Sequence, residues 1–162
     1  MHNLVKPISL MAFDFGLKQI GVAYGQTVTK QAKGLTIIKA QDGTPNWITI
    51  TGLIDKWQPN ILLVGLPLNM DSSESELSGR ARKFARRLEG RFASPVKMVD
   101  ERLSTREAKS IIRENQNGNS GRDIDLTKID DIAAAVILQS WFDDPSNETS
   151  IYPPNRPHLS SK

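Results

Sequence analysis

The stretch Ile61–Leu66 (ILLVGL) decides the fold class, because it is a continuous apolar run between the polar Asn60 and a proline. Such a run is typical of a central strand that is covered on both faces. Apolar residues at helical spacing precede it at Trp47, Ile50, Ile54 and Trp57, and follow it at Leu77, Ala81, Phe84, Ala85 and Leu88. Amphipathic helices on both sides of a buried strand predict an α/β protein.

Three strands are expected before this run. Residues 8–15 (ISLMAFDF), 21–25 (GVAYG) and 35–40 are separated by short turns, which predicts an antiparallel meander. The sequence Asp42-Gly43-Thr44-Pro45 is typical of a turn into a helix, with Thr44 as the N-cap and Pro45 at the first helical position.

The elements expected after the run are a helix from about residue 76 to Phe92, a strand at residues 96–99, a helix opening near residue 104 and a buried helix over residues 132–141. Ser104 with Glu107, and Thr127 with Asp130, have the form of capping boxes that open the last two helices. The predicted order β-β-β-α-β-α-β-α-α gives a mixed sheet of about five strands with helices on both faces. We expect one domain over residues 1–142 and a disordered tail over residues 143–162.

Composition excludes several kinds of chemistry. The chain has no cysteine, and its two histidines, His2 and His158, lie near the ends, so thiolate sites, imidazole metal sites and a Ser-His-Asp triad are not expected. Any bound metal would have oxygen ligands, which favours Mg²⁺ or Mn²⁺. No apolar segment is long enough to cross a membrane or to serve as a signal peptide, so a cytoplasmic protein without membrane association is expected.

The charge is concentrated in one sector. The chain has a formal net charge of +3, whereas residues 80–113 carry eleven Lys and Arg against four Asp and Glu. This sector is either a solvated helix face or a surface that contacts nucleic-acid phosphates.

Three carboxylates follow predicted strand ends or open a helix. Asp14 ends the first strand, Glu101 follows the strand at residues 96–99, and Asp130 lies in the first turn of the last helix. Ligands of open α/β sheets bind beyond strand ends, and clustered carboxylates repel one another unless a cation lies between them. Two divalent ions about 3.5–4 Å apart can support phosphodiester hydrolysis without histidine or cysteine. The alternatives are turn chemistry for Asp14, ion pairing for Glu101 and helix capping for Asp130.

Four blocks in order carry a resemblance to a known family. They are residues 14–23 (DFGLKQIGVA), residues 64–71 (VGLPLNMD), residues 100–105 (DERLST), and Lys128-Ile129-Asp130 with the later Ala134 and Ile137-Leu138. The sequence resembles the pre-16S rRNA nuclease family, also called the YqgF or Holliday-junction-resolvase-like family, over residues 10–142. The resemblance implies a ribonuclease-H-like fold.

The resemblance also implies that Asp14, Glu101 and Asp130 are metal-binding catalytic acids. The implied activity is hydrolysis of phosphodiester bonds in RNA, with a role in maturing the 5′ end of the 16S rRNA precursor. Asp131 directly follows Asp130 and is the alternative third acid, because successive helical residues point about 100° apart and both cannot face the same ion equally.

Basic residues near the acids are expected to contact phosphate. We assign this role to Lys18 and Arg102, for which an organising salt bridge is the alternative. The residues of the helix near residue 80 that are expected to hold the nucleic-acid backbone are Arg80, Arg82, Arg86 and Arg87. Trp47, Trp57 and Trp141 fall at helical core spacing and are interpreted as packing residues rather than base-stacking residues.

Two other functions stay open. One is a non-catalytic module that binds RNA or the ribosome, and the other is a Holliday-junction resolvase acting on branched DNA. A resolvase normally presents two sites in a symmetric dimer, and the sequence specifies no dimer interface, so a homodimer is left open. The Asp14-Phe15-Gly16 sequence also occurs in protein kinases, but the other kinase motifs are missing.

Overall fold

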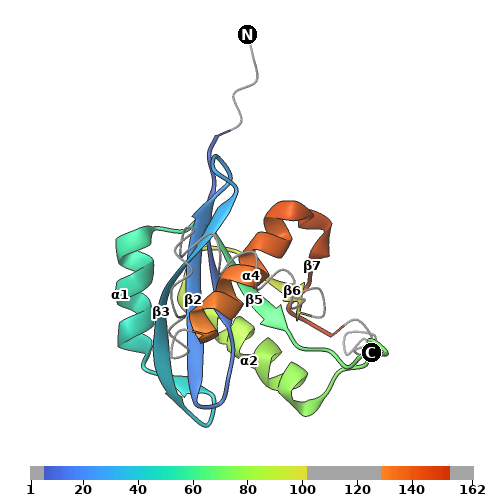
Figure 1. Ribbon diagram of the computed structural model, residues 1–162. Helices are drawn as coiled ribbons and strands as arrows, with labels where there is room; N and C mark the ends of the chain where they lie inside the picture. Colours follow the sequence, from blue (N-terminus) through green and yellow to red (C-terminus); the bar gives the residue numbers. More distant parts are fainter. Residues whose placement is uncertain (1–5, 102–128, 154–162) are drawn as a thin grey trace, which may run out of the picture.

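One mixed sheet organises the computed structural model, which describes residues 6–101 and 129–153 (Figure 1). Within these ranges the strands are β1 (Ser9–Asp14), β2 (Gln19–Gln26), β3 (Gln31–Gln41), β4 (Thr44–Pro45), β5 (Ile61–Leu66), β6 (Val96–Asp100) and β7 (Glu148–Thr149). Their order across the sheet is β4-β3-β2-β1-β5-β6-β7. The α/β class is confirmed, with seven described strands where about five were predicted.

The pairing of the strands explains where a site can form. β1, β2 and β3 pair in antiparallel order, which confirms the predicted meander. β5 pairs in parallel with β1 on one side and with β6 on the other, which confirms the predicted central strand. Because β1, β5 and β6 run in the same direction, their carboxyl ends meet at one edge of the sheet.

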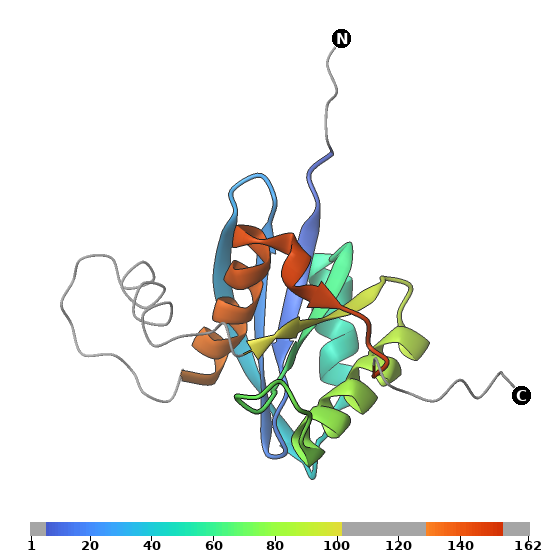
Figure 2. The ribbon, with the colours of Figure 1, turned by 90° about the vertical axis from the view of Figure 1, so that its right-hand side faces the viewer.

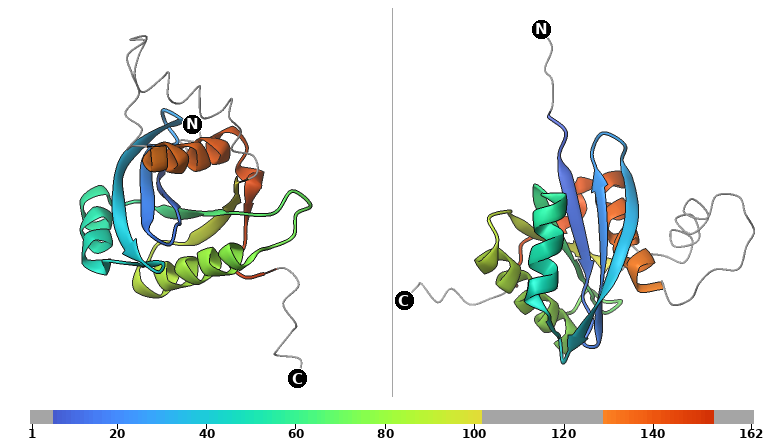
Figure 3. Two further views of the ribbon diagram at one scale, coloured as in Figure 1. Left: turned by 60° about the horizontal axis from the view of Figure 1, so that its bottom comes forward. Right: turned by 90° about the vertical axis from the view of Figure 1, so that its left-hand side faces the viewer.

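Helices cover both faces of this sheet, as predicted. The described helices are α1 (Trp47–Trp57), α2 (Glu76–Arg91) and α4 (Ile129–Asp143). α1 and α2 pack on one face and α4 lies across the other (Figure 3). None of the helices in the described ranges is long and apolar enough to span a bilayer. The helix expected from Ser104 lies outside the described residues.

The start of α1 differs from the sequence prediction. Asp42 and Gly43 have φ angles of 50° and 82°, as in the type I′ turn of a hairpin, and Thr44 and Pro45 pair with Gln41 and Ala40 as β4. The N-cap of α1 is Asn46, whose side chain accepts a hydrogen bond from the Ile48 amide at 3.0 Å. The prediction of Thr44 as N-cap was wrong because Asp42 and Gly43 form a hairpin turn, which places Thr44 and Pro45 in a strand before the helix begins.

The chain after α4 is ordered further than predicted. Pro145–Asn147 forms a 3-10 helix, and β7 pairs with β6 on the edge of the sheet (Figure 2). Ile151 is 3% exposed and packs in the core beneath α2. The predicted disorder from residue 143 was therefore wrong for residues 144–151, since their apolar and backbone groups are held by the sheet. Residues 154–162 lie outside the described residues.

Candidate active site

Asp14 and Glu101 stand at the shared carboxyl edge of the parallel strands. Asp14 is the last residue of β1, and Glu101 directly follows β6. β5 separates these two strands, and its pairing of Phe13 with Val64 and of Val99 with Gly65 places Gly65 between them. The two acids are 87 positions apart in sequence, but both lie at the same edge of the sheet, on either side of β5.

Both acids belong to the face of the sheet that α4 covers. Side chains alternate between faces along a strand, and Leu10, Ala12 and Val99 pack with α4. Asp14 and Glu101 are an even number of residues from these positions and share their face. Asp14 follows Ala12 by two, and the Glu101 carboxylate lies beside Gly65 and near Ile137 of α4, so both acids lie on the face that α4 covers.

Gly65 leaves the room that the Glu101 carboxylate occupies. A Cβ at position 65 would lie 2.8 Å from Glu101 Oε2 and 2.5 Å from Ile137 Cδ1. Real Cβ atoms do not approach other atoms so closely, so any side chain at this position would displace Glu101, Ile137 or both. Sequence reasoning did not assign Gly65 to the site. A glycine inside an otherwise apolar strand is the signal that could have found it, because it often marks a close approach.

The first turn of α4 lies toward the same edge. Phe142, near the end of α4, packs against Gly25, which pairs with Leu10 near the start of β1. α4 therefore runs opposite to β1, and its first turn lies at the end where β1 stops (Figure 2). Asp130 and Asp131 are in that turn, and their side chains lie outside what the structure describes.

The described donors fit a hard divalent cation. Two carboxylates lie at the carboxyl ends of β1 and β6, the parallel strands on either side of β5, and carboxylate oxygens are the ligands that Mg²⁺ and Mn²⁺ prefer. The open position at Gly65 keeps the Glu101 carboxylate at this edge. Among the side chains that the structure describes, no three acids or histidines form a metal-binding group. A third ligand from α4 would complete such a group.

Comparison with known proteins identifies the family. A family model described as "RuvX: Holliday junction resolvase" matches residues 8–144. The chain belongs to this family.

Relatives of the RuvX family are similar over most of the chain. A Haemophilus ducreyi protein named "Putative pre-16S rRNA nuclease" is 56% identical over 135 residues, which cover 83% of this chain and 96% of the relative. A Yersinia pestis protein of the same name is 51% identical over 136 residues, 84% of this chain and 95% of the relative. The resemblance found in the sequence is confirmed.

A solved structure supports the fold assignment. The RuvC protein of Thermus thermophilus superposes with a TM-score of 0.56 at 11% identity, covering 88% of this chain and 99% of the other. At this identity the likeness concerns the fold alone, and it confirms the predicted ribonuclease-H-like architecture.

Arg82 is not on the basic surface of this RuvX-family chain. Its side chain is 2% exposed, and Nε and Nη2 donate to the Glu74 carboxylate at 2.6–3.0 Å. Nη1 donates to the Ser150 carbonyl at 2.7 Å. The prediction that Arg82 contacts nucleic acid was wrong, because this guanidinium ties the loop before α2 to the segment after β7. Its spacing from the buried Ser78 and Ala85 is the sequence signal for the inner face.

The other predicted phosphate contacts remain on the surface or outside the described residues. Arg87 is exposed, and Arg86 lies with its guanidinium carbon 6.0 Å from the Tyr152 ring centre. Arg80 is half-buried and pairs with Asp42 at 3.1 Å. Lys18 is exposed in the turn between β1 and β2, and Arg102 lies outside the described residues.

The tryptophans are half-buried and pack against the core, in keeping with the predicted packing role. Trp47 stacks on Phe84 with ring centres 5.8 Å apart, and Trp57 packs on Tyr24 at 4.7 Å. Trp141 donates from Nε1 to the Glu148 carboxylate at 2.9 Å.

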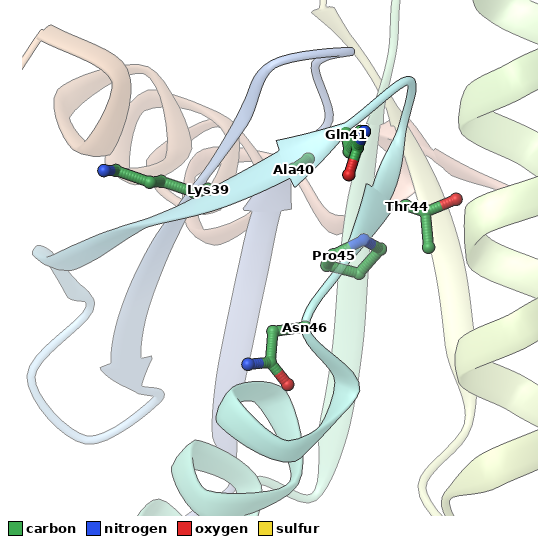
Figure 4. A pocket seen from close by; sticks show the side chains of 6 residues that line it. All are labelled: Lys39, Ala40, Gln41, Thr44, Pro45 and Asn46. Carbon is green, nitrogen blue, oxygen red and sulfur yellow. The ribbon is translucent and has the colours of Figure 1, made fainter.

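An open hollow of about 630 Å³ lies beside the β3–β4 hairpin. Its lining includes Lys39, Gln41, Thr44 and Asn46 (Figure 4). β3 and β4 are the strands at the far side of the sheet from β6, so this hollow is separate from the acidic edge.

Proposed function

We propose that this protein is a divalent-metal-dependent nuclease that hydrolyses phosphodiester bonds in RNA and matures the 5′ end of a 16S rRNA precursor. The observation that carries the proposal is that Asp14 and Glu101 flank Gly65 at one sheet edge, on the face covered by α4. The names of the relatives in Haemophilus ducreyi and Yersinia pestis support RNA as the substrate. A cytoplasmic location is part of the same proposal, because ribosome precursors are its substrate.

The proposed ligands of Mg²⁺ or Mn²⁺ are Asp14, Glu101 and Asp130, with Asp131 as the alternative on α4. When bound, such an ion activates water and stabilises the charge that develops on phosphate oxygens. Glu101 is held in place between Gly65 and Ile137, so its carboxylate needs little reorganisation to serve as a ligand.

Basic side chains would hold the RNA beside the acids. We assign backbone contacts to Lys18, Arg80, Arg86 and Arg87, and to Arg102 next to Glu101. Arginine suits this role because its planar fork of donors matches phosphate oxygens.

The substitution Asp14→Asn tests the catalytic assignment. Removing one charged ligand is expected to lower the rate of Mn²⁺-dependent RNA cleavage by about 10³-fold, since several kcal/mol of charge stabilisation are lost. Thermal unfolding should be unchanged within a few degrees. The matched control is Asp55→Asn, the same chemical change at an exposed position of α1, which should keep full activity.

The outcome also separates two functions. If Asp14→Asn cleaves RNA as fast as wild type, the catalytic assignment of Asp14 is wrong. If neither protein cleaves RNA and both support ribosome maturation in cells, the protein is a non-catalytic RNA-binding module. If wild type cleaves four-way DNA junctions faster than RNA, the resolvase function given in the family description is correct instead. Sedimentation of the active species shows whether it is a homodimer.

A further inference from the structure

A small polar cavity lies between the β3–β4 turn and α2. Its volume is about 150 Å³, and its polar lining comes from Asp42, Gly43, Thr44, Arg80, Lys83 and Arg87. Phe15 and Phe84 also line the cavity but are themselves buried, so they offer little ring surface for a base to stack on. The cavity therefore suits a small polar group rather than a nucleobase.

The charge of the cavity is positive. Arg80, Lys83 and Arg87 are spaced three and four residues apart and lie on one side of α2. Asp42 supplies the one carboxylate of the lining, and it is occupied by Arg80, whose Nη2 lies 3.1 Å from Asp42 Oδ1 and 2.7 Å from the Asp42 carbonyl. Within residues 6–101 and 129–153, neither Lys83 nor Arg87 forms an ion pair with a carboxylate. Two cations are thus available to an anion.

The wall opposite α2 is fixed by the backbone. Gly43 has a φ of 82°, and a Cβ there would lie 2.9 Å from Phe15 Cζ and 3.4 Å from Arg80 Nη2. Only glycine meets both conditions without strain. The cavity is therefore a formed feature of the fold, because the turn, the Phe15 ring and Arg80 define one another's positions.

The cavity is also tied to the catalytic edge. Phe15 directly follows Asp14, and the Gly43 amide donates to the Leu17 carbonyl at 2.8 Å. The cavity therefore lies at the same end of the sheet as Asp14 but on the opposite face, because Phe15 packs in the core under α2 whereas Asp14 shares the face of Ala12. The proposed strand would cross this end of the sheet to reach both.

We propose that this cavity binds an internal phosphodiester group of the nucleic-acid substrate, with Lys83 and Arg87 as its ligands and Arg80 as the residue that shapes the site. The proposal rests on the proposed function, because it needs a nucleic-acid strand at the edge beside Asp14. Lysine and arginine are the side chains that recognise phosphate, as a point charge and as a planar fork of donors.

The test is RNA binding by full-length protein without added metal, so that cleavage is not measured. The double variant Lys83→Gln with Arg87→Gln is expected to bind RNA about tenfold more weakly at 0.1 M salt, as for the loss of a charged hydrogen bond. The slope of log affinity against log salt should become shallower by about one unit for one lost phosphate contact. The matched control is Lys33→Gln with Lys56→Gln, two exposed lysines outside the cavity, which should change affinity less than twofold.

A second variant is expected to change RNA affinity in the opposite direction. Asp42→Asn removes the carboxylate of the lining and frees Arg80, so it is expected to tighten RNA binding severalfold; asparagine tolerates the positive φ of this turn. Equal weakening by the cavity variant and its lysine control would overturn the proposal, as would weaker binding of Asp42→Asn.

Two RNA substrates distinguish an internal phosphate from a terminal one. RNA with a 5′-hydroxyl and RNA with a 5′-phosphate should lose the same affinity in the cavity variant, and a loss confined to 5′-phosphorylated RNA would contradict the internal assignment. The proposal and the nuclease function fail separately. Unchanged binding by the cavity variant refutes the cavity alone, whereas undiminished cleavage by Asp14→Asn refutes the catalytic assignment alone.

Discussion

The two faces of the sheet are built from side chains of different size. The face under α1 and α2 carries large apolar groups, among them Phe13 and Phe84, whose rings meet edge to face with centres 5.6 Å apart. The face under α4 also has large groups such as Leu10 and Leu63, but small residues lie among them, namely Ala12, Ala23 and Gly65 on the sheet and Ala134 and Ala135 on the helix. Small residues let α4 approach the sheet closely.

This difference separates stability from chemistry. The large face buries most of the apolar surface, which supplies most of the free energy of folding. The small face brings the helix that carries Asp130 close to the strands that carry Asp14 and Glu101. The proposed site therefore depends on the close approach of α4 to the sheet, while the stability of the fold depends on the core under α1 and α2.

The largest predicted effect is on the large face. Phe84→Ala removes a buried ring that contacts Phe13, Phe15 and Trp47, and is expected to lower the free energy of unfolding by about 3–5 kcal/mol. Urea denaturation measures this loss. A cost below 1 kcal/mol would contradict the role given to this core.

The next effect concerns Arg82, a charged residue buried on the same face. Arg82→Ala leaves the Glu74 carboxylate, 27% exposed, and the Ser150 carbonyl without their donor, and is expected to cost about 3 kcal/mol. RNA affinity of the folded variant should stay within twofold of wild type, because the guanidinium does not reach the surface. A large loss of RNA affinity at full folding would restore the nucleic-acid role predicted from the sequence. A double-mutant cycle with Glu74→Gln measures the coupling of the pair.

On the small face, Gly65→Ala is expected to destabilise the protein by about 1–3 kcal/mol, because the new methyl group collides with Ile137 and Glu101. Cleavage by the folded variant should fall by about 10–100-fold, as for displaced supports of a metal ligand. The rate must be measured at a temperature where circular dichroism shows a fully folded variant. If Gly65→Ala were as stable as wild type, the claim that α4 packs closely on this face would be wrong.

The smallest effect is a control with the same chemical change. Gly52→Ala on α1 meets no atom within 4 Å of the new Cβ, and is expected to raise the free energy of unfolding by about 0.5–1 kcal/mol through the higher helix propensity of alanine. RNA cleavage should be unchanged. Opposite signs for positions 52 and 65 would show that close packing, rather than alanine itself, decides the outcome.

Long apolar patterns were predicted correctly and short elements were not. Ile61–Leu66 and the amphipathic helices around it have enough residues to show their periodicity. β4 and β7 have two residues each, too few for an alternating pattern, and their pairing depends on partners elsewhere in the chain. Arg82 was misassigned because its partners, Glu74 and Ser150, are 8 and 68 residues away and do not show in the pattern of α2.

Local hydrophobic periodicity was enough to give the α/β class, the order of the long elements in the described ranges, and the positions of Asp14 and Glu101 at strand ends. The folded chain was needed to show that the two acids share a face, that Gly65 makes room for one of them, and that Arg82 is buried while Lys83 and Arg87 line a cavity. These features arise from contacts between segments distant in the chain, and such contacts exist only once the sheet and its helices have packed.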